Sequence, residues 1–292
     1  MKPIQVLLSH AIDYAGLFPP AGLSMDTALA NHVAYHEGND AWALGRFIIP
    51  VQRLSEFERF APEGSGWRLS ALVGTEFSGE LDQVLSFNRR GTHGTIDTIE
   101  LKVDSTKTIS DVMNRLPPGL QAYFEVPVEG SAQLLAAIAQ TSGRAKVRTG
   151  GVTAEAFPST RNLLGFIEGC ERARVPFKAT AGLHHPLRAE YPYTYDPNSR
   201  RGPMFGFLNL FLATALIRNG SDSRLASSIL EESSRAALTV DEQSITWNGH
   251  RLDLPALHRA RESMVSFGSC SFTEPLAELR ALDLLEPEVQ RA

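Results

Sequence analysis

The sequence predicts an α/β fold in which short strands and helices alternate around one barrel, and three observations favour it. Between residues 46 and 182, six β-branched segments alternate with segments of helical periodicity, as in βα units on a parallel sheet. These strands are apolar at alternate positions and carry charges at many of the others. A chain of 292 residues could form two average domains, but α/β barrels commonly form one domain of about 200 to 250 residues. We therefore expect a single TIM-barrel-like domain over residues 1–292, irregular in its last quarter.

The expected elements are as follows, in chain order. Residues 1–40 form an N-terminal addition that contains one helix, at 23–38, capped by Ser24 and closed by Gly38. The six strands lie at residues 46–51, 68–74, 98–104, 122–128, 145–150 and 176–182. The regularity ends after the sixth strand, where we expect helices at 205–218 and 224–236, a hairpin at 237–254, a helix at 255–262, a last strand at 263–269 and a helix at 274–285. The hairpin and helices of 237–292 are interpreted as a C-terminal addition.

The distribution of polar residues on the strands distinguishes a barrel from an open sheet. An open, doubly wound sheet is the alternative architecture, and its strands should be apolar almost throughout because helices cover both faces. Here one side of each strand is polar, and in a barrel that side faces inward. The inward set is Arg46, Glu100, Lys102, Asp104, Tyr123, Glu125, Lys146, Arg148, Lys178 and Thr180. The active site of such a barrel lies at the C-terminal ends of its strands.

The charges of this inward set predict the kind of ligand. Five cations face three carboxylates, so 5 − 3 leaves a formal charge of +2, although the whole chain carries −5. A cationic interior in an acidic protein favours a small anionic substrate, a carboxylate or a phosphate. The alternative is a structural network of ion pairs, whose net contribution to stability is often small because desolvation offsets the attraction.

Lys178 is the most unusual residue of the set, because it occupies the middle of the strand in "VPFKATAGLHHP" (175–186). Neighbouring cations and apolar walls disfavour its charged form, so we expect a lowered pKa. A neutral amine can form a Schiff base with an aldehyde or ketone. Lys178 is therefore the predicted nucleophile.

The stretch "FKATAG" (177–182) resembles the strand that carries the Schiff-base lysine in deoxyribose-phosphate aldolases, which are class I aldolases with a TIM-barrel fold. The resemblance implies Lys178 as nucleophile, Lys102 or Lys146 as the neighbour that lowers its pKa, and Glu100, Asp104 or Glu125 as proton shuttle. The stretches "AIDYAGLFPPA" (11–21), "KVRTGG" (146–151) and "FKATAGLHHPLR" (177–188) resemble those of a bacterial family with no assigned activity. That second resemblance implies no mechanism.

The stretch "KVRTGG" predicts an anion site beside the lysine. Arg148 offers a planar fork for a carboxylate or phosphate, and the amides of Gly150 and Gly151 could approach the same anion. We therefore assign substrate binding to Lys146, Arg148, Gly150 and Gly151, together with Arg46.

His184 and His185 follow the sixth strand, where a loop should overhang the mouth of the barrel. We predict His184 as a catalytic acid or base and His185 as a substrate contact, with metal ligation or a structural role left open. The further ligands available for a metal, His10, Asp13, Glu100 and Glu125, have no diagnostic spacing, so no metal site is assigned and the cofactor stays open. His10 and Asp13 belong either to a plug or to the mouth, and the loop 188–206 is a lid or a subunit contact.

Other classes of protein are disfavoured by composition. No run of like charges points to a nucleic-acid surface. The longest apolar stretch, at 204–217, contains Asn209 and is shorter than the roughly 20 residues of a membrane span. Neither a secretory leader nor C-x-x-C spacing is present, so we expect a cytoplasmic protein with Cys170 as a buried, inert thiol and Cys270 not favoured as a nucleophile.

Three functions remain from the sequence. The first is an enzyme that acts on a small anionic carbonyl compound, by carbon–carbon cleavage or by enolisation, and therefore an aldolase-like lyase. The second is a metal-dependent hydrolase or lyase of the barrel class. The third is a non-catalytic binder of an anionic metabolite. A homo-oligomer is left open.

Overall fold

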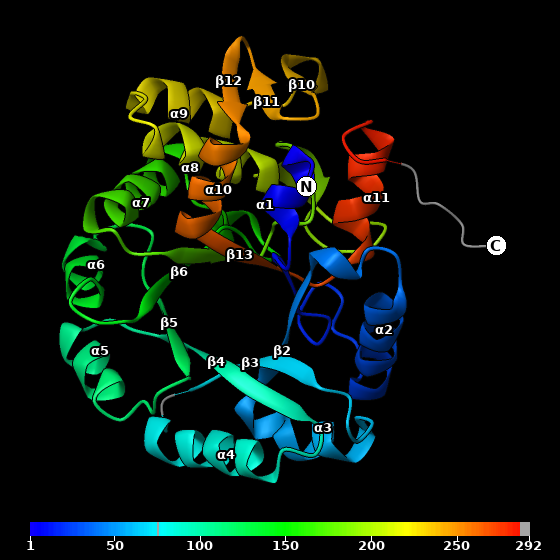
Figure 1. Ribbon diagram of the computed structural model, residues 1–292, viewed down its shortest axis with the longest axis vertical. Helices are drawn as coiled ribbons and strands as arrows, with labels where there is room; N and C mark the ends of the chain where they lie inside the picture. The colour runs from blue at the N-terminus through cyan, green and yellow to red at the C-terminus, as the bar shows by residue number, and fades with distance from the viewer. Residues whose placement is uncertain (75, 287–292) are drawn as a thin grey trace.

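Eight parallel strands close into a barrel in the computed structural model, which describes residues 1–74 and 76–286 (Figure 1). Around the barrel the strands follow the order β1-β13-β7-β6-β5-β4-β3-β2. Their bounds are β1 (Ile12–Tyr14), β2 (Leu44–Pro50), β3 (Trp67–Leu72), β4 (Gly94–Lys102), β5 (Gln121–Glu125), β6 (Arg144–Arg148), β7 (Phe177–Thr180) and β13 (Met264–Ser269). The expected α/β TIM-barrel-like fold is confirmed, and the open sheet is wrong.

The first barrel strand lies within the segment that the sequence assigned to an N-terminal addition. β1 pairs with β13 on one side and with β2 on the other, and so completes the ring. Three residues are too few to show a period of two, which is why the pattern did not predict this strand. The segment 1–40 is therefore part of the barrel.

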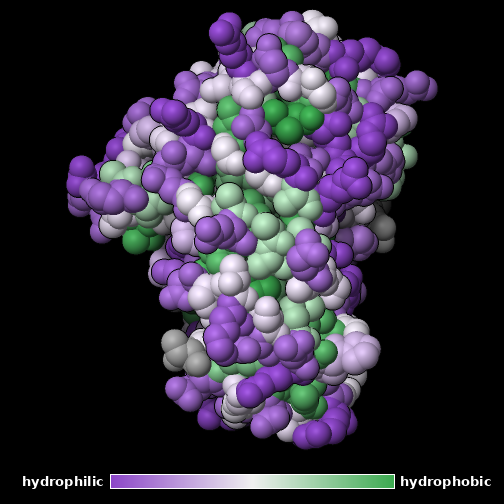
Figure 2. Space-filling model, turned by 90° about the vertical axis from the view of Figure 1, so that its left-hand side faces the viewer, coloured by the Kyte–Doolittle hydropathy of each residue, from purple (hydrophilic) through white to green (hydrophobic). Residues whose placement is uncertain are grey.

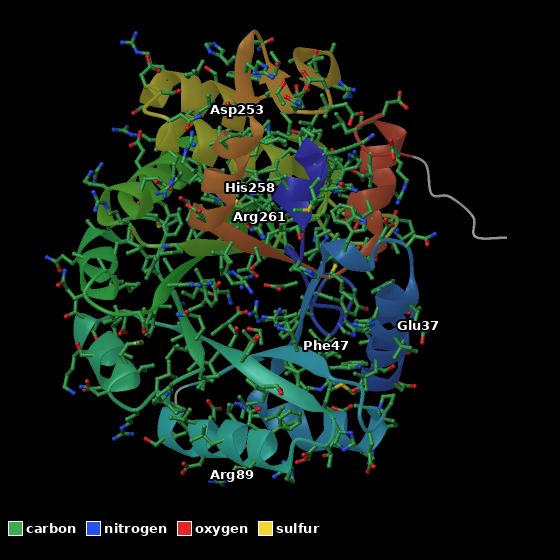
Figure 3. The ribbon with its side chains drawn as sticks, viewed as in Figure 1. Glu37, Phe47, Arg89, Asp253, His258 and Arg261 are labelled. Carbon is green, nitrogen blue, oxygen red and sulfur yellow. The ribbon has the colours of Figure 1, made fainter. Side chains whose placement is uncertain are left out.

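Helices surround the ring, as Figure 1 shows. Their bounds are α1 (Pro3–Leu8), α2 (Met25–Glu37), α3 (Leu54–Phe60), α4 (Phe77–Arg90), α5 (Thr106–Met113), α6 (Ala132–Ile138), α7 (Thr160–Ala173), α8 (Phe207–Arg218), α9 (Ser223–Leu230), α10 (Leu254–Ser263) and α11 (Thr273–Ala281). Figure 3 shows Arg89 on the outer side of α4, whereas Phe47 of β2 is fully buried in the layer between strands and helices. The face of the molecule in Figure 2 is mostly hydrophilic, with a patch of apolar residues near its middle.

The regular alternation stops after β7, as predicted. An antiparallel hairpin, β8 (Ala189–Pro192) and β9 (Arg201–Met204), follows β7, and a three-stranded sheet, β10 (Leu238–Val240), β11 (Ser244–Trp247) and β12 (His250–Asp253), precedes α10. The predicted turn at Asn248 and Gly249 joins β11 to β12, and both residues have positive φ. The predicted helix 224–236 is shorter, since α9 ends at Leu230.

Most of the apolar stretch at 204–217 forms the buried helix α8, which begins at Phe207, whereas Met204 ends β9. Every residue of α8 from Phe207 to Leu216 is buried, because α7, α9 and α10 pack around it. Asn209 is tolerated there because its amide group donates to the carbonyls of Ile229 and Glu232 and its oxygen accepts from the amide of Arg188. Within the described residues, no helix has both the length and the apolar character needed to cross a membrane.

Candidate functional site

Five side chains of alternating charge cross the inside of the barrel. The Lys178 ammonium lies 2.5 Å from a carboxylate oxygen of Asp13 and 2.7 Å from one of Glu100. The Lys146 ammonium lies 2.8 Å from the other oxygen of Glu100 and 2.9 Å from Glu125. The row therefore reads Asp13, Lys178, Glu100, Lys146, Glu125, and we call it the charge row.

Strand register brings this row together. Lys146 of β6 is the register partner of Lys178 in β7 and of Glu125 in β5, so the two lysines lie side by side. Their side chains point inward because both occupy the polar parity of their strands. The residues alternating with them, such as Val147 and Ala179, are completely buried on the side that faces the helices. The parity predicted from the sequence is thus correct for the central strands.

Two serines hold the carboxylates of the row in place. Ser70 of β3 donates to Glu100 Oε1 at 2.6 Å, and Ser266 of β13 donates to Asp13 Oδ2 at 2.8 Å. The other oxygen of Asp13 accepts the amide of Arg46 at 2.8 Å. A Cβ at position 45 would overlap that oxygen, so Gly45 is required for the close approach. These buried carboxylates are therefore fully hydrogen-bonded, as buried charges need to be.

Sequence reasoning predicted a lowered pKa for Lys178, and this is wrong. Burial does disfavour the ammonium, but the charges of Asp13 and Glu100 and their hydrogen bonds outweigh it and raise the pKa above its usual value. For Glu100, burial disfavours the carboxylate, yet Lys146 and Lys178 hold its pKa well below the usual range. Lys146, the register partner of Lys178 in β6, contacts the same Glu100, and the negative charge of that carboxylate offsets the repulsion between the two lysines.

The predicted surplus of positive charge is also wrong. Arg46 lies toward the N-terminal ends of the strands, where it pairs with Asp97, and it does not line the cavity described below. Lys102 and Asp104 are exposed, and Lys102 opens onto a neighbouring groove. Without these three residues, and with Asp13 included, the site holds three cations and three carboxylates, so 3 − 3 gives a formal charge of zero. They are Lys146, Arg148 and Lys178, and Asp13, Glu100 and Glu125.

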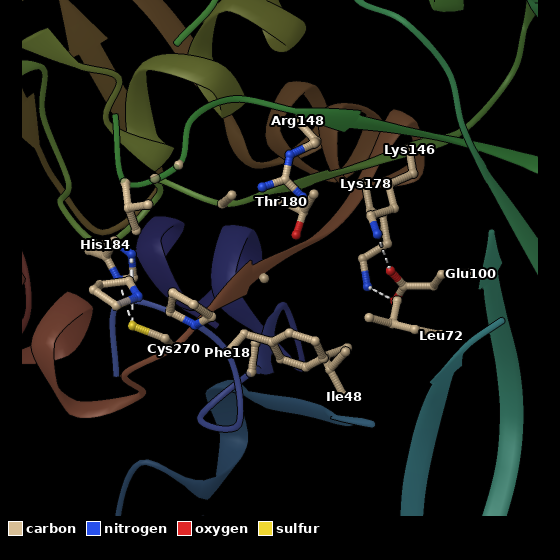
Figure 4. Close-up of a pocket in the computed structure, with 18 residues that line it drawn as sticks. Phe18, Ile48, Leu72, Glu100, Lys146, Arg148, Lys178, Thr180, His184 and Cys270 are labelled. Carbon is tan, nitrogen blue, oxygen red and sulfur yellow. Dashed lines mark hydrogen bonds and ion pairs between the residues drawn. The ribbon is translucent and has the colours of Figure 1, made fainter. Parts of the chain in front are cut away.

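A cavity of about 230 Å³ lies at the C-terminal ends of the strands, above the charge row. Figure 4 shows Lys146, Lys178 and Glu100 at one end of it and His184 and Cys270 at the other. The lining is Ala15, Phe18, Pro19, Pro20, Ile48, Leu72, Glu100, Lys146, Arg148, Gly151, Val152, Lys178, Thr180, Ala181, Gly182, His184, Gly268 and Cys270. The segment after β1 therefore covers one wall of the mouth, with Phe18 and the two prolines.

Arg148 is the cation of the cavity whose charge no described residue neutralises. Its side chain is exposed, and among the described residues it has no hydrogen bond or ion pair. Gly151 lines the cavity beside it, whereas Gly150 lies behind and packs closely against the ring of Phe157. Arg148 and Gly151 thus lie at the cavity as predicted. Gly150 does not line it, and its lack of a side chain makes room for the ring of Phe157.

The two adjacent histidines face different surroundings. His184 lines the cavity, its Nδ1 lies 3.1 Å from Ser269 Oγ, and burial together with the charge of His185 lowers its pKa to about 4. Its imidazole is therefore neutral near pH 7. His185 does not line the cavity: its ring stacks on Tyr191 at 3.4 Å, and its Nδ1 lies 2.7 Å from Glu278 Oε1. The predicted substrate contact of His185 is not supported by this placement.

The metal ligands considered from the sequence do not form one group. Asp13, Glu100 and Glu125 are already paired with lysines in the charge row. His10 Nδ1 lies 3.1 Å from the carbonyl oxygen of Leu44, and His10 does not line the cavity. The three carboxylates therefore belong to an ion-pair network at the centre of the barrel.

Sequence reasoning missed the roles of Asp13, Ser70 and Ser266. Ser70 and Ser266 are small hydroxyl residues in the middle of their strands, at positions that face inward. That parity was a usable signal for both. Asp13 was left undecided between plug and mouth because β1 was not recognised as a strand.

Comparisons with protein-family models, with curated proteins and with solved structures find no match to this chain.

Proposed function

We propose that the chain is an enzyme that acts on a small anionic carbonyl compound through a lysine Schiff base, as an aldolase-like carbon–carbon lyase or an enolising enzyme. One observation carries the proposal: two lysine ammonium groups share the carboxylate of Glu100 in a buried row that borders a cavity at the mouth of the barrel. Active sites of TIM barrels lie at this end of the strands.

The charge row suits the intermediate of this chemistry. The lysine ammonium first gives one proton to a neighbouring carboxylate, and the neutral amine then attacks the carbonyl carbon. The carboxylic acid returns this proton to the carbinolamine oxygen, the oxygen leaves as water, and the product is a protonated imine with one positive charge. Its charge equals that of the ammonium it replaces, so the carboxylates that stabilise the ammonium also stabilise the iminium. The iminium accepts the electron pair when a bond to the adjacent carbon breaks.

Lys146 is the better candidate for the reacting amine. The Lys178 ammonium is held between Asp13 and Glu100, whose side chains are 1% and 2% exposed. One partner of Lys146 is Glu125, whose side chain is 15% exposed and lines the same neighbouring groove as Lys102. A proton passed to Glu125 can therefore reach solvent. We therefore assign the nucleophile to Lys146, the proton transfer to Glu125, and to Lys178 the role of holding Glu100 ionised. This replaces the sequence-based assignment of Lys178 as nucleophile.

The other groups of the cavity fit the rest of the reaction. Arg148 supplies an unpaired guanidinium for the carboxylate or phosphate of the substrate, which a planar fork binds through two hydrogen bonds. No described residue forms a hydrogen bond or an ion pair with this guanidinium. The neutral imidazole of His184 lies at the far end of the cavity and can accept or return the proton of the adjacent carbon.

The test is reductive trapping. Borohydride is added with a panel of small aldehydes and keto acids, and the adduct is located by peptide mass spectrometry. We expect one adduct on the peptide that contains Lys146, lost in Lys146→Arg because arginine keeps the charge and removes the nucleophile. Lys107→Arg, on the exposed surface of α5, is the matched control and should trap like the parent.

An adduct on Lys178 would retain the Schiff base and reverse the two lysine roles. Absence of any adduct, with saturable binding of the same anions, would favour a non-catalytic binder. That second candidate is supported by the raised pKa of Lys178, since a lysine that stays protonated attracts an anion but does not attack a carbonyl.

A further inference from the structure

A second group of polar side chains lies at the rim of the cavity, where the loop after β7 meets α11. It consists of His184 and His185 from the loop and Glu274 and Glu278 from the helix. His185 and the two glutamates take no part in the proposed reaction, and none of these three lines the cavity.

The two glutamates reach toward the two histidines in parallel. Glu274 and Glu278 are four residues apart on α11 and so lie on the same face of the helix. His185 Nδ1 lies 2.7 Å from Glu278 Oε1, and His184 Nδ1 lies 3.6 Å from Glu274 Oε2. One ligand atom from each of His185, Glu274 and Glu278 can be chosen so that all three lie within 4.8 Å of one another.

This spacing is close to that of a metal site. Bonds of about 2.0 to 2.2 Å to histidine nitrogen and carboxylate oxygen hold neighbouring ligand atoms roughly 3 to 4 Å apart. Small rotations of the two glutamate side chains would bring the three ligand atoms of His185, Glu274 and Glu278 into that range.

The charge of the group is not balanced by a permanent cation. In the described part of the chain, neither Glu274 nor Glu278 forms an ion pair with a lysine or an arginine; their only ionic neighbours are the histidines. Both histidines are 7% exposed, so little solvent reaches the side of the carboxylates that faces them. Two carboxylates beside two imidazoles form a favourable environment for a divalent cation.

Tyrosines from the β8–β9 region hold the ligands in position. The ring of Tyr191 stacks on that of His185, with centroids 3.4 Å apart and planes inclined by 7°. The hydroxyl of Tyr195 donates to Glu274 Oε2 at 2.9 Å. Such outer contacts fix the orientation of metal ligands and strengthen binding.

We propose that His185, Glu274 and Glu278 bind a divalent transition-metal ion, with Zn²⁺ or Mn²⁺ as the class, at the rim of the barrel. The imidazole ligand favours these ions over Mg²⁺ and Ca²⁺, which prefer oxygen donors alone. The bound ion replaces the hydrogen bond between His185 and Glu278 and joins the loop after β7 to α11. Because His184 precedes His185 in that loop and lines the cavity, the ion fixes one wall of the mouth.

The experiment is titration of the chelator-treated full chain with Zn²⁺ or Mn²⁺ by calorimetry, together with thermal melting. We expect one saturable equivalent and a metal-dependent rise in the melting temperature, since a ligand that binds only the folded state stabilises it. Glu278→Gln and His185→Gln should each weaken binding at least tenfold and remove the rise. Glu190→Gln, which removes an exposed carboxylate from β8, is the matched control and should bind like the parent.

Far-UV circular dichroism and the melting temperature without metal establish that each variant is folded. The proposal is overturned if the parent protein shows no saturable binding, or if folded Glu278→Gln and His185→Gln bind with the parent's affinity. Lysine trapping in the same samples reports on the proposed function separately, because the charge row shares no residue with this group.

Discussion

Basic side chains are buried in two regions of the molecule, with charged partners in one and without them in the other. The first region is the inside of the barrel, and the second is the layer of aromatic rings between α2 and strands β2 and β3, where His32 packs against Phe47 and Trp67. Inside, Lys178 is 1% exposed and contacts two carboxylates. Outside, His32 of α2 is 3% exposed, its ring packs 4.3 Å from that of Trp67, and neither ring nitrogen has a hydrogen-bond partner in the described structure. Burial disfavours the charged form of both, yet the pKa of Lys178 is raised and that of His32 falls to about 4. The partner, and not the depth of burial, decides the charge.

The largest expected effect comes from removing the cation inside the barrel. Lys178→Met leaves Asp13 and Glu100 without the ammonium they share, and an uncompensated buried charge costs about 3 to 5 kcal/mol of unfolding free energy. Urea denaturation measures the loss. Lys107→Met is the control on the exposed surface of α5, where we expect a change within about 0.5 kcal/mol. Equal losses in the two variants would contradict the role assigned to the carboxylates.

A smaller effect, dependent on pH, is expected for His32. Its folded pKa of about 4 lies below the unfolded value of 6.5, so the unfolded chain binds the proton first as the pH falls. The free energy of unfolding therefore falls as the pH drops from 6.5 to 4, and the fall due to His32 amounts to about 2 kcal/mol at pH 5.

His32→Phe keeps an aromatic ring among its neighbours and removes the titrating group. The variant should therefore lose less stability than the parent between pH 7 and pH 5, as measured by urea denaturation at both values. His258→Phe, at an exposed position of α10, controls for the loss of a histidine as such. Parallel stability curves for the parent and His32→Phe would show that His32 is not the group that titrates.

The smallest effect is expected for Ser70, which donates a hydrogen bond to Glu100. Ser70→Ala removes one of the hydrogen bonds to the ionised Glu100, and a bond to a charged group contributes about 1.5 to 3 kcal/mol. We expect a loss near the lower limit, because the two lysines still hold Glu100. Ser110→Ala, which removes an exposed serine of α5, should cost less in the same urea titration. A loss as large as that of Lys178→Met would show that the hydroxyl group stabilises Glu100 as much as the lysine does, and would contradict this expectation.

Much of the fold could be predicted from residues that act locally. The six strands expected between residues 46 and 182 and the late one at 263–269 all belong to the barrel, and each predicted segment is long enough to show its alternation. The hairpin expected at 237–254 lies in a separate sheet. β1 was missed because three residues carry no period. The β8–β9 hairpin was missed as well, since its pairing joins residues separated by a loop with no two-residue turn signal.

The candidate site was predicted in part. Glu100, Lys146, Lys178 and Glu125 meet as the parity indicated, and Arg148 and His184 line the same cavity. Arg46 and Lys102 share that parity but lie elsewhere. Parity gives the face of a residue, whereas its height along the barrel axis depends on the stagger of the strands.

The sequence by itself determined which side chains face the inside of the barrel, because alternation along a strand follows from local backbone geometry. Only the tertiary structure decided which of them touch. Asp13 lies 165 positions before Lys178, and the two meet because closure of the ring places β13 between β1 and β7. That contact reverses the predicted charge behaviour of Lys178, since electrostatic interactions fall off with distance in space and take no account of separation along the chain.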